Sequence, residues 1–487
     1  MLEQAQTDSK ADSLTREAVE FAVNLKYEDL PAEALHLARR CVLDGLAVML
    51  AGTEQPALAV LERYIGRVGG VGDARLLGNA ARKVPAHHAA LWYGLAGHAM
   101  DWDDTQLAEG PGRPYGLLTH PTVPPLSAAL AIGEMLGGID GKTFMTAFQA
   151  GFEVECKIAE AINPDHYMRG FHTSGTIGTF GSAICAAKLL GFDAEQTATT
   201  VGIAASMASG IRANFGTMTK PLHVGRSSEN GVTAALLVRD GFSANQEALD
   251  GKWGYLAIAG PGGEPDLVRG RFGKPFSILE PGISIKPYPC GVLTHPSMDA
   301  LLFLMKENDL RVQDIKKITL RAAKNILGPI RYTFARTELE GKFCMHFLLA
   351  AIAIAGRAGK AEFTDAFVAR PDVQDMQRRV ETIDDPEIEA MGFDRIRSRI
   401  IVETASGQTI ERWADENYRG SPHNPLSDAE VEGKFRDCAA GLLDETEIQA
   451  VFARVWSLDT QASATDVLSD LDWRAGRAAQ SVAGARA

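Results

Sequence analysis

GHAMDWDDT (residues 97–105) is the first of three polar segments that interrupt an otherwise apolar, helix-forming stretch of the chain. The other two are YMRGFHTSGTIGTFG (167–181) and RANFGTMTKPLHVGRSSENG (212–231). This stretch contains five of the eleven histidines, and its third segment is rich in cations although the net charge is −13. Imidazoles, carboxylates and cations together are the groups that bind and deprotonate small anions. We therefore predict that the three segments converge in one site for an anionic substrate.

The size and composition of the chain are those of a large globular protein. Its 487 residues are enough for a large core and for two domains, and 46% of them are hydrophobic. The acidic balance argues against general nucleic-acid binding, which needs a basic surface. The polar start, MLEQAQTDSKADS, lacks the apolar run of a signal peptide, and no window reaches the ~18 apolar residues of a membrane span. We expect a cytoplasmic protein without nucleic-acid or membrane partners.

Residues 13–274 are expected to form an all-helical domain. Apolar residues recur there with helical period, and Ala-rich VPAHHAALWYGLAGHAMD would place His98 and Asp101 on one helix face. Residues 416–465 return to this period, so we predict that they rejoin the same domain. The ends that we expect to be disordered or flexible are residues 1–12 and 466–487.

Residues 275–415 differ in pattern and are predicted to form a separate α+β domain. SILEPGISIKPYPC (277–290) reads as an extended entry segment, and DIKKITLRAAK (314–324) alternates like a strand. Residues 394–415 predict a hairpin with its turn at Ser406-Gly407. The fold class is therefore mainly α with an α+β part.

Four motifs resemble those of the MmgE/PrpD family, whose members include 2-methylcitrate dehydratase, cis-aconitate decarboxylase and iminodisuccinate epimerase. They are HAMDWDDT (98–105), GFHTSGTIGTFG (170–181), TKPLHVG (219–225) and KPYPCGVLTH (286–295). The resemblance extends from about Ser13 to Leu458. It implies a large helical domain formed by both ends of the chain, a smaller α+β lid and a homodimer. It also implies activity on small di- or tricarboxylates without a metal or an organic cofactor.

The resemblance implies a set of site residues at the matching positions. Asp101 and Thr105 match the D-x-D-D-T element of the family, and His120 in LTHPT matches a site histidine that follows it. His172 in GFHTSGT and Lys220 in TKP match two further site positions.

Two departures from the family pattern lie in or near the lid. The decarboxylase has a catalytic histidine in a K-x-x-P-x-H motif, whereas this chain has Gly291 at that place in KPYPCG. His295 lies four residues further on and is a candidate replacement, and Lys286 opens the motif. Phe347 is assigned to the position of a lid tyrosine of the decarboxylase. Both departures count against cis-aconitate decarboxylation.

Removing water from a hydroxy acid requires a base for the proton beside the carboxylate and an acid for the departing hydroxide. Histidine suits either task near neutral pH, and cations must hold the substrate carboxylates. We assign these roles to His120 and His172, in an order that the sequence leaves open, with Lys220 and Arg212 as the carboxylate clamp. The predicted catalytic residues are His120, His172, Lys220 and Asp101, and the predicted substrate-binding residues are Thr105, Arg212, His223, Lys286 and His295.

A metal site is the main alternative interpretation of the acidic cluster. Asp101, Asp103 and Asp104 could bind a cation together with His98 or His120, but their spacing matches no standard metal motif. We therefore expect no metal, with Asp101 orienting a neighbouring His or Lys. An Ala-rich helix makes His98 more typical of a packed residue.

The leading hypothesis is a cofactor-independent hydro-lyase similar to 2-methylcitrate dehydratase, an enzyme of propionate metabolism. Epimerisation of a dicarboxylate and cis-aconitate decarboxylation are the alternatives that share its chemistry. A metal-dependent hydrolase and a non-catalytic paralogue are less favoured.

Overall fold

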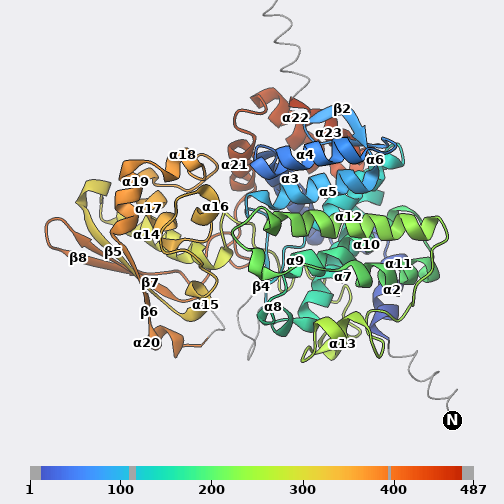
Figure 1. Ribbon diagram of the computed structural model, residues 1–487, viewed down its shortest axis with the longest axis horizontal. Coiled ribbons are helices and arrows are strands. Elements are labelled where there is room, and N and C mark those ends of the chain that lie inside the picture. Colours follow the sequence, from blue (N-terminus) through green and yellow to red (C-terminus); the bar gives the residue numbers. More distant parts are fainter. Residues whose placement is uncertain (1–12, 109–116, 393–395, 474–487) are drawn as a thin grey trace, which may run out of the picture.

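The computed structural model describes residues 13–108, 117–392 and 396–473 and shows two parts (Figure 1). The larger part, the helical body, contains both the first and the last helices of the chain. The smaller part, the lid, runs from η4 to β8 and packs helices on a four-stranded sheet. The predicted fold class, mainly α with an α+β part, is confirmed. The exact domain limits predicted from the sequence stay predictions.

The helical body takes its elements from two separate parts of the sequence, with η marking 3-10 helices. They are α2 (Leu14–Asn24), η1 (Tyr27–Asp29), α3 (Ala32–Gly52), α4 (Pro56–Val68), β1 (Ala74–Leu76), β2 (Asn79–Val84), α5 (Ala86–Ala99), β3 (Gln106–Leu107), β4 (Leu117–Thr119), α6 (Val123–Met135), α7 (Gly141–Ile162), α8 (Asp165–Met168), α9 (Thr173–Thr176), α10 (Gly178–Leu189), α11 (Ala194–Met207), η2 (Arg212–Asn214), α12 (Thr219–Arg239), α13 (Tyr255–Ala259), η3 (Pro265–Leu267), α21 (Asp428–Ala439), α22 (Glu445–Trp456), η6 (Leu458–Thr460), η7 (Ala464–Asp466) and α23 (Val467–Asp470).

The lid is built around a mixed sheet with the strand order β6-β5-β7-β8. β5 pairs parallel with β6 and antiparallel with β7, which forms the predicted hairpin with β8. β7 alternates buried and partly exposed residues, as expected for a strand with one covered face. β6 was not predicted, because this short strand is largely exposed and lacks a clear apolar alternation. The elements are η4 (Val292–Thr294), α14 (His295–Glu307), η5 (Val312–Asp314), β5 (Ile315–Ala322), α15 (Lys324–Leu327), α16 (Glu338–Gly341), α17 (Met345–Ala355), α18 (Asp365–Val368), α19 (Pro371–Arg378), β6 (Val380–Asp384), α20 (Pro386–Glu389), β7 (Ser398–Thr404) and β8 (Thr409–Trp413).

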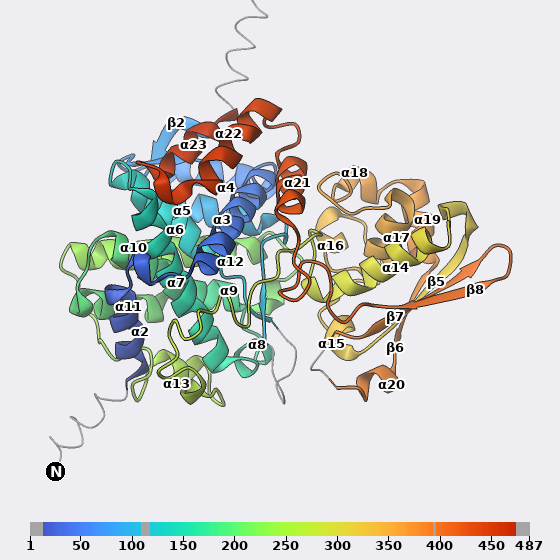
Figure 2. The same ribbon diagram turned by 180° about the vertical axis from the view of Figure 1, so that it is seen from behind.

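Two connections join the helical body to the lid, and they lie together (Figure 2). The entering connection, residues 277–291, contacts the returning connection, where the hydroxyls of Ser284 and Tyr418 lie 2.6 Å apart. Thr105 and Ser284 form an isolated antiparallel bridge. The entering connection is thus tied to the polar segment that follows α5.

A buried ion pair joins the C-terminal helices to the N-terminal helices. Lys434 on α21 binds Asp44 on α3 with 2.6 Å between Nζ and Oδ1. The flexible tail predicted from residue 466 is wrong for the residues that the structure describes, because α23 is helical and Leu471 and Trp473 are buried. Residues 1–12 and 474–487, also expected to lack order, lie outside the described residues.

Two local predictions are corrected by the helix boundaries. His98 and Asp101 do not share a helix face, because α5 ends at Ala99 and Asp101 has a left-handed φ of 54°. The third polar segment, predicted to interrupt the helical pattern, is itself helical from Thr219 and includes Lys220 and His223. They lie in the first turns of α12, which begins at Thr219 and tolerates Pro221 there because its first N–H groups need no helical acceptor.

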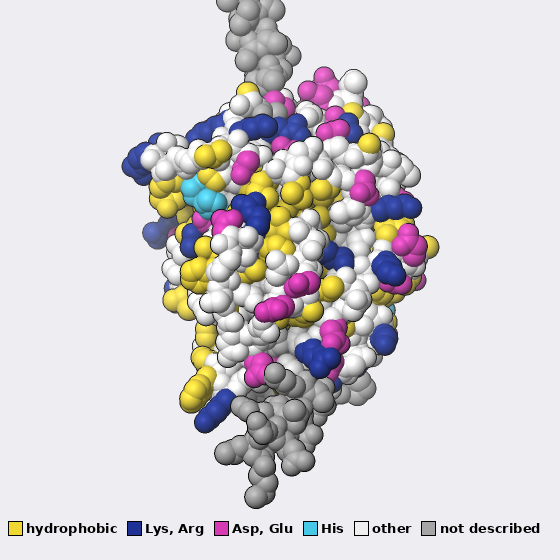
Figure 3. All heavy atoms as spheres, turned by 90° about the vertical axis from the view of Figure 1, so that its right-hand side faces the viewer, with side chains coloured by type: hydrophobic (Ala, Val, Ile, Leu, Met, Phe, Trp, Pro, Cys, Tyr) yellow, Lys and Arg dark blue, Asp and Glu magenta, His cyan; other side chains and the backbone are white. Residues whose placement is uncertain are grey.

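Figure 3 shows the face of the helical body that lies away from the lid, where apolar side chains gather in the middle of the view. The homodimer predicted from the sequence stays a prediction. None of the helices within the described residues combines the length and the apolar character that crossing a membrane requires.

The antiparallel pair α5 and α12 packs so closely that glycine is required at the crossing. A Cβ atom on Gly94 of α5 would lie 2.4 Å from Ser228 Oγ and 2.7 Å from the Val224 carbonyl oxygen of α12. A Cβ atom on Gly225 would lie 2.9 Å from the Leu91 carbonyl oxygen. Since His98 lies on α5 and Lys220 on α12, this contact fixes the relative position of two polar residues.

We predict that Gly94→Ala lowers the free energy of unfolding by about 1–3 kcal/mol, because the helices must move apart. Gly433→Ala is the matched control: Gly433 is exposed on α21, a Cβ there would meet nothing within 4 Å, and alanine favours the helix by up to ~1 kcal/mol. Urea unfolding followed by circular dichroism measures both. A Gly94→Ala protein as stable as the unmutated protein would contradict the packing argument.

Candidate active site

A cavity lies between the helical body and the lid, and its two sides differ in chemistry. The lid side is largely apolar, whereas the helical body and the entering connection contribute the charged and imidazole groups. Its lining residues are Asp101, His120, Tyr167, His172, Phe215, Lys220, Lys286, Gly291, Val292, Leu293, Thr294, Ile326, Pro329, Ile330 and Phe343.

Asp101 binds two lysines at the polar side of the cavity. Lys220 Nζ lies 2.8 Å from Asp101 Oδ1, and Lys286 Nζ lies 3.3 Å from the same oxygen and 2.8 Å from the Asp101 carbonyl. Burial alone would raise the pKa of Asp101, but the two ammonium groups outweigh it and hold the pKa well below its ordinary value. The carboxylate is therefore ionised, and two cations face one anion.

Lys220 also begins a buried hydrogen-bond chain. Its Nζ donates to His98 Nε2 at 2.8 Å, and His98 Nδ1 donates to Asp103 at 2.8 Å. Burial lowers the pKa of His98 although Asp103 opposes this, so the imidazole is neutral. The chain fixes the His98 tautomer with Nδ1 protonated and connects Lys220 to a carboxylate that does not line the cavity.

His120 is held in one tautomer by a backbone carbonyl. Its Nδ1 lies 2.7 Å from the Asp104 oxygen, and since a carbonyl only accepts, Nδ1 carries the proton. Thr105 Oγ1 lies 3.2 Å from the same nitrogen. Burial, helped by the nearby cations, lowers the pKa of His120 to about 3 even though Asp103 raises it. His120 is thus a neutral imidazole whose Nε2 carries a lone pair.

His172 contributes a second neutral imidazole to the cavity wall. Its Nδ1 lies 3.1 Å from His223 Nδ1, so only one of these two nitrogens carries a proton in that contact. Burial, followed by the charge of Lys220, holds the pKa of His172 well below its ordinary value. His172 Nε2 is buried and has no hydrogen-bond partner within the described residues. This nitrogen is available to a bound molecule.

The Asp104 carboxylate accepts hydrogen bonds from Thr122 and does not line the cavity. Thr122 donates to it from both its backbone N–H and its hydroxyl. Burial raises the pKa of Asp104 to about 7, against the lowering effect of these bonds. The acids of the D-x-D-D-T element thus play different parts, with Asp101 and Asp103 ionised and Asp104 partly protonated near neutral pH.

Five of the nine predicted site residues reach the cavity, and four do not. Asp101, His120, His172, Lys220 and Lys286 line it. Thr105 and His223 lie behind His120 and His172, respectively.

Arg212 and His295 do not have the positions predicted for substrate contacts. The Arg212 guanidinium stacks on the Tyr167 ring at 3.7 Å and donates to the Tyr167 carbonyl. His295 is fully buried at the start of α14, with Nε2 3.2 Å from the Cys290 carbonyl, so it does not replace the histidine absent at Gly291.

The assignment of Phe347 to a cavity position is also corrected. Phe347 is fully buried and packs edge-to-face on Phe363 in the lid core. Phe343, four residues earlier, lines the cavity instead. Sequence reasoning did not assign His98, Asp103 or Phe343 to the site. The H-x-x-x-x-D spacing of HAMDWD was the one signal that could have paired His98 with Asp103.

One metal-ligand cluster, His98, Asp101 and His120, coincides with the site, with ligand atoms within 4.8 Å of one another. Lys220 already binds both His98 and Asp101, and Lys286 binds Asp101 as well. A divalent cation here would lie beside two ammonium groups and would have to displace them. The charge arrangement favours an anion over a metal ion.

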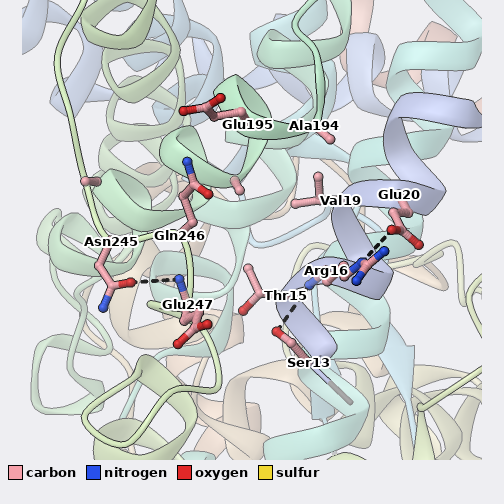
Figure 4. A pocket seen from close by; sticks show the side chains of 12 residues that line it. Ser13, Thr15, Arg16, Val19, Glu20, Ala194, Glu195, Asn245, Gln246 and Glu247 are labelled. Atoms are coloured by element: carbon pink, nitrogen blue, oxygen red, sulfur yellow. Dashed lines mark hydrogen bonds and ion pairs between the residues drawn. The ribbon is translucent and has the colours of Figure 1, made fainter. Parts of the chain in front are cut away.

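A second pocket lies between the start of α2, the start of α11 and residues 244–247 (Figure 4). Its charged side chains are Arg16, Glu20, Glu195 and Glu247, and Arg16 is paired with Glu20 at 2.6 Å. Histidine and lysine do not occur among its lining residues within the described chain. It therefore lacks the proton-transfer and anion-binding groups of the interdomain cavity.

The lowered pKa of His120 predicts that it contributes to acid sensitivity. The folded protein protonates His120 only near pH 3, whereas an unfolded chain does so near its ordinary value of 6.5. Between these values the unfolded state binds more protons, so stability falls as the pH decreases from 6.5, by up to about 1.4 kcal/mol per pH unit. We expect His120→Gln to show a shallower decrease in urea unfolding between pH 6.5 and 4. His36→Gln, at the surface, is the control, and equal slopes for His120→Gln and the unmutated protein would contradict the assignment.

Comparison with known proteins agrees with the motifs. Residues 16–268 match the MmgE/PrpD N-terminal domain, and residues 288–458 match the MmgE/PrpD C-terminal domain. The human cis-aconitate decarboxylase is 26% identical over 456 residues, covering 92% of each chain. The cis-aconitate decarboxylase of Aspergillus terreus (strain NIH 2624 / FGSC A1156) is 26% identical over 492 residues, covering 96% of this chain and 97% of the relative. The cis-aconitate decarboxylase-like protein oryM of Aspergillus oryzae (strain ATCC 42149 / RIB 40) is 25% identical over 484 residues, covering 95% and 98%. The chain described here belongs to the MmgE/PrpD family.

Proposed function

We propose that the protein is a cofactor-independent hydro-lyase that dehydrates a small hydroxy-di- or tricarboxylate, as 2-methylcitrate dehydratase does. One observation carries this proposal: His120, His172, Lys220 and Lys286 face the same interdomain cavity. Two neutral imidazoles and two cations are the groups needed to move a proton beside a carboxylate and to hold the carboxylate itself.

His120 is the proposed base. Because Nδ1–H is donated to the Asp104 carbonyl, the Nε2 lone pair is the one that accepts a proton from the carbon beside the carboxylate. As the C–H bond breaks, negative charge develops on the carboxylate, and the ammonium groups of Lys220 and Lys286 stabilise it. A positioned base contributes about 10²–10⁴ in rate when its pKa lies near the working pH, so this role requires the bound substrate carboxylates to raise the pKa of His120 from about 3.

Lys220 is the proposed acid for the departing hydroxyl, while the neutral His172 can hold the substrate by a hydrogen bond at Nε2. A C=C bond forms as the C–O bond breaks, and the hydroxide leaves as water after it takes one proton. Burial lowers the pKa of Lys220 although Asp101 opposes this, which makes its ammonium group a better proton donor than an exposed lysine. The proton taken up by His120 balances the one that leaves.

The apolar lid side of the cavity supports a substrate that carries an apolar group. Val292, Leu293, Ile326, Ile330 and Phe343 face the polar residues across the cavity. A methyl group there avoids the desolvation cost that a further carboxylate would incur opposite these side chains. Citrate has a hydrogen in place of this methyl group and would bury less apolar surface against these side chains, which favours 2-methylcitrate over citrate as the hydroxy-tricarboxylate.

Decarboxylation and epimerisation remain the alternatives, because both use the same base and clamp. Two relatives at 26% identity are cis-aconitate decarboxylases by name, and a third at 25% is a cis-aconitate decarboxylase-like protein by name, which supports a tricarboxylate as substrate. Incubating the protein with 2-methylcitrate, citrate, cis-aconitate and iminodisuccinate in D₂O and following the products by NMR separates the reactions. We expect 2-methylcitrate to lose water fastest; faster release of CO₂ from cis-aconitate would favour the decarboxylase, and no reaction or deuterium uptake with any compound would support a non-catalytic paralogue. Loss of turnover on chelation, restored by zinc, would instead favour a metal-dependent hydrolase.

We predict that Lys220→Ala and His172→Ala each lower the turnover number at least about 100-fold, because each removes a charged or hydrogen-bonding group from the reacting atoms. Circular dichroism should show unchanged helicity. His36→Ala, which replaces an exposed histidine, is the control and should retain full turnover. Near-normal rates in both site variants would remove these residues from the proposed mechanism.

A further inference from the structure

A second cluster of potential ligands lies on the same two helices as the active site but at some distance from the cavity. His87 and His88 occupy the first turn of α5, and Glu229 lies on α12 beside them. Their ligand atoms lie within 4.8 Å of one another. None of the three lines the interdomain cavity, and the proposed lyase reaction does not use them.

The two histidines have no visible structural role that would explain their burial. His88 is only 9% exposed, and its Nδ1 is buried without a hydrogen-bond partner within the described residues. The His87 and His88 rings lie beside each other with 4.1 Å between their centroids and their planes tilted by 52°. A buried polar atom without a partner is costly, so a bound group that satisfies it would stabilise the fold.

The charge state of the cluster suits a metal ion. Burial lowers the pKa of His87 to about 4, helped by His88 and Arg226, and burial also lowers the pKa of His88. Both imidazoles are therefore neutral near pH 7, which is the form that binds metals. Glu229 adds a carboxylate oxygen from a side chain that is 10% exposed.

We propose that His87, His88 and Glu229 bind one divalent transition-metal ion of the zinc type, with solvent completing its coordination. Two imidazoles and one carboxylate are a ligand set that zinc accepts, and nitrogen ligands favour zinc, copper and nickel over magnesium or calcium. The site would be structural, because it is separate from the cavity.

Arg226 competes with the proposed metal ion for the Glu229 carboxylate. Its Nη1 donates to Glu229 Oε2 at 2.5 Å, so the guanidinium occupies the carboxylate that the ion needs. The Arg226 side chain is 49% exposed and can move into solvent when an ion binds. Binding of the metal therefore replaces one ion pair by three coordination bonds, and removing Arg226 should favour it.

The position of the cluster means that a bound ion would cross-link α5 and α12. His88 precedes His98 by ten residues on α5, or about 15 Å along a helix axis, and Glu229 follows Lys220 by nine residues on α12. The glycine crossing at Gly94 lies between the two ends. A metal ion would join α5 and α12 at one end while His98 and Lys220 meet at the other.

Titration calorimetry of Zn²⁺ into the chelator-treated full-length protein tests the proposal. We expect saturable binding that His87→Ala and the nearly isosteric Glu229→Gln weaken at least about tenfold, since loss of even an outer partner of a metal ligand costs 10–100-fold. Arg226→Ala should bind Zn²⁺ more tightly than the unmutated protein. His36→Ala, a histidine on another surface, is the control and should bind unchanged.

Co²⁺ in place of Zn²⁺ gives a readout that identifies the ligands. Nitrogen and oxygen ligands produce visible d–d bands without the intense near-ultraviolet bands of thiolate ligands, and these d–d bands should vanish in His87→Ala. The proposal is overturned if the unmutated protein shows no saturable Zn²⁺ binding, or if His87→Ala and Glu229→Gln bind as it does. Equal binding in those variants would locate the ion elsewhere, for example at His98, Asp101 and His120.

Discussion

The ion pairs of Asp101 with Lys220 and Lys286 are the interaction on which the site depends. Asp101 follows α5, Lys220 begins α12, and Lys286 lies in the connection that enters the lid, so one carboxylate joins three separate parts of the chain. Two buried ammonium groups without this carboxylate would be strongly destabilising. At the cavity wall the two ammonium groups share this one carboxylate, while the ionised Asp103 lies behind His98, so both lysines can still bind a substrate carboxylate.

The histidines around this ion cluster are fixed by partners that do not themselves line the cavity. His98 is held between Lys220 and Asp103, and His120 by the Asp104 carbonyl. The D-x-D-D-T element therefore orients two imidazoles and binds two lysines within five residues. This explains how neutral imidazoles and ammonium groups coexist in one small buried volume, because His98, Lys220 and His120 each have a fixed hydrogen-bond partner.

The helical period and the change of pattern near residue 275 predicted the fold class, and the resemblance to the MmgE/PrpD family singled out His120, His172, Lys220 and Lys286, which line the cavity. The direction of individual side chains could not be predicted, because it depends on packing between distant segments. Phe343 and Phe347 differ by four residues, yet only the lid core decides which one faces the cavity. His98 was misjudged for the same reason, since its partner Lys220 is 122 residues away and its Ala-rich surroundings are typical of a packed helix.

The affinity for tricarballylate, a tricarboxylate without a hydroxyl group to lose, tests the central claim most directly. Calorimetry should give a dissociation constant for Lys286→Met that is about 10–100 times larger than that of the unmutated protein, because a hydrogen bond to a charged group contributes about 1.5–3 kcal/mol. The difference should shrink as the salt concentration rises. Equal affinity of the two proteins at low salt would contradict a site in which the paired lysines bind the substrate carboxylates.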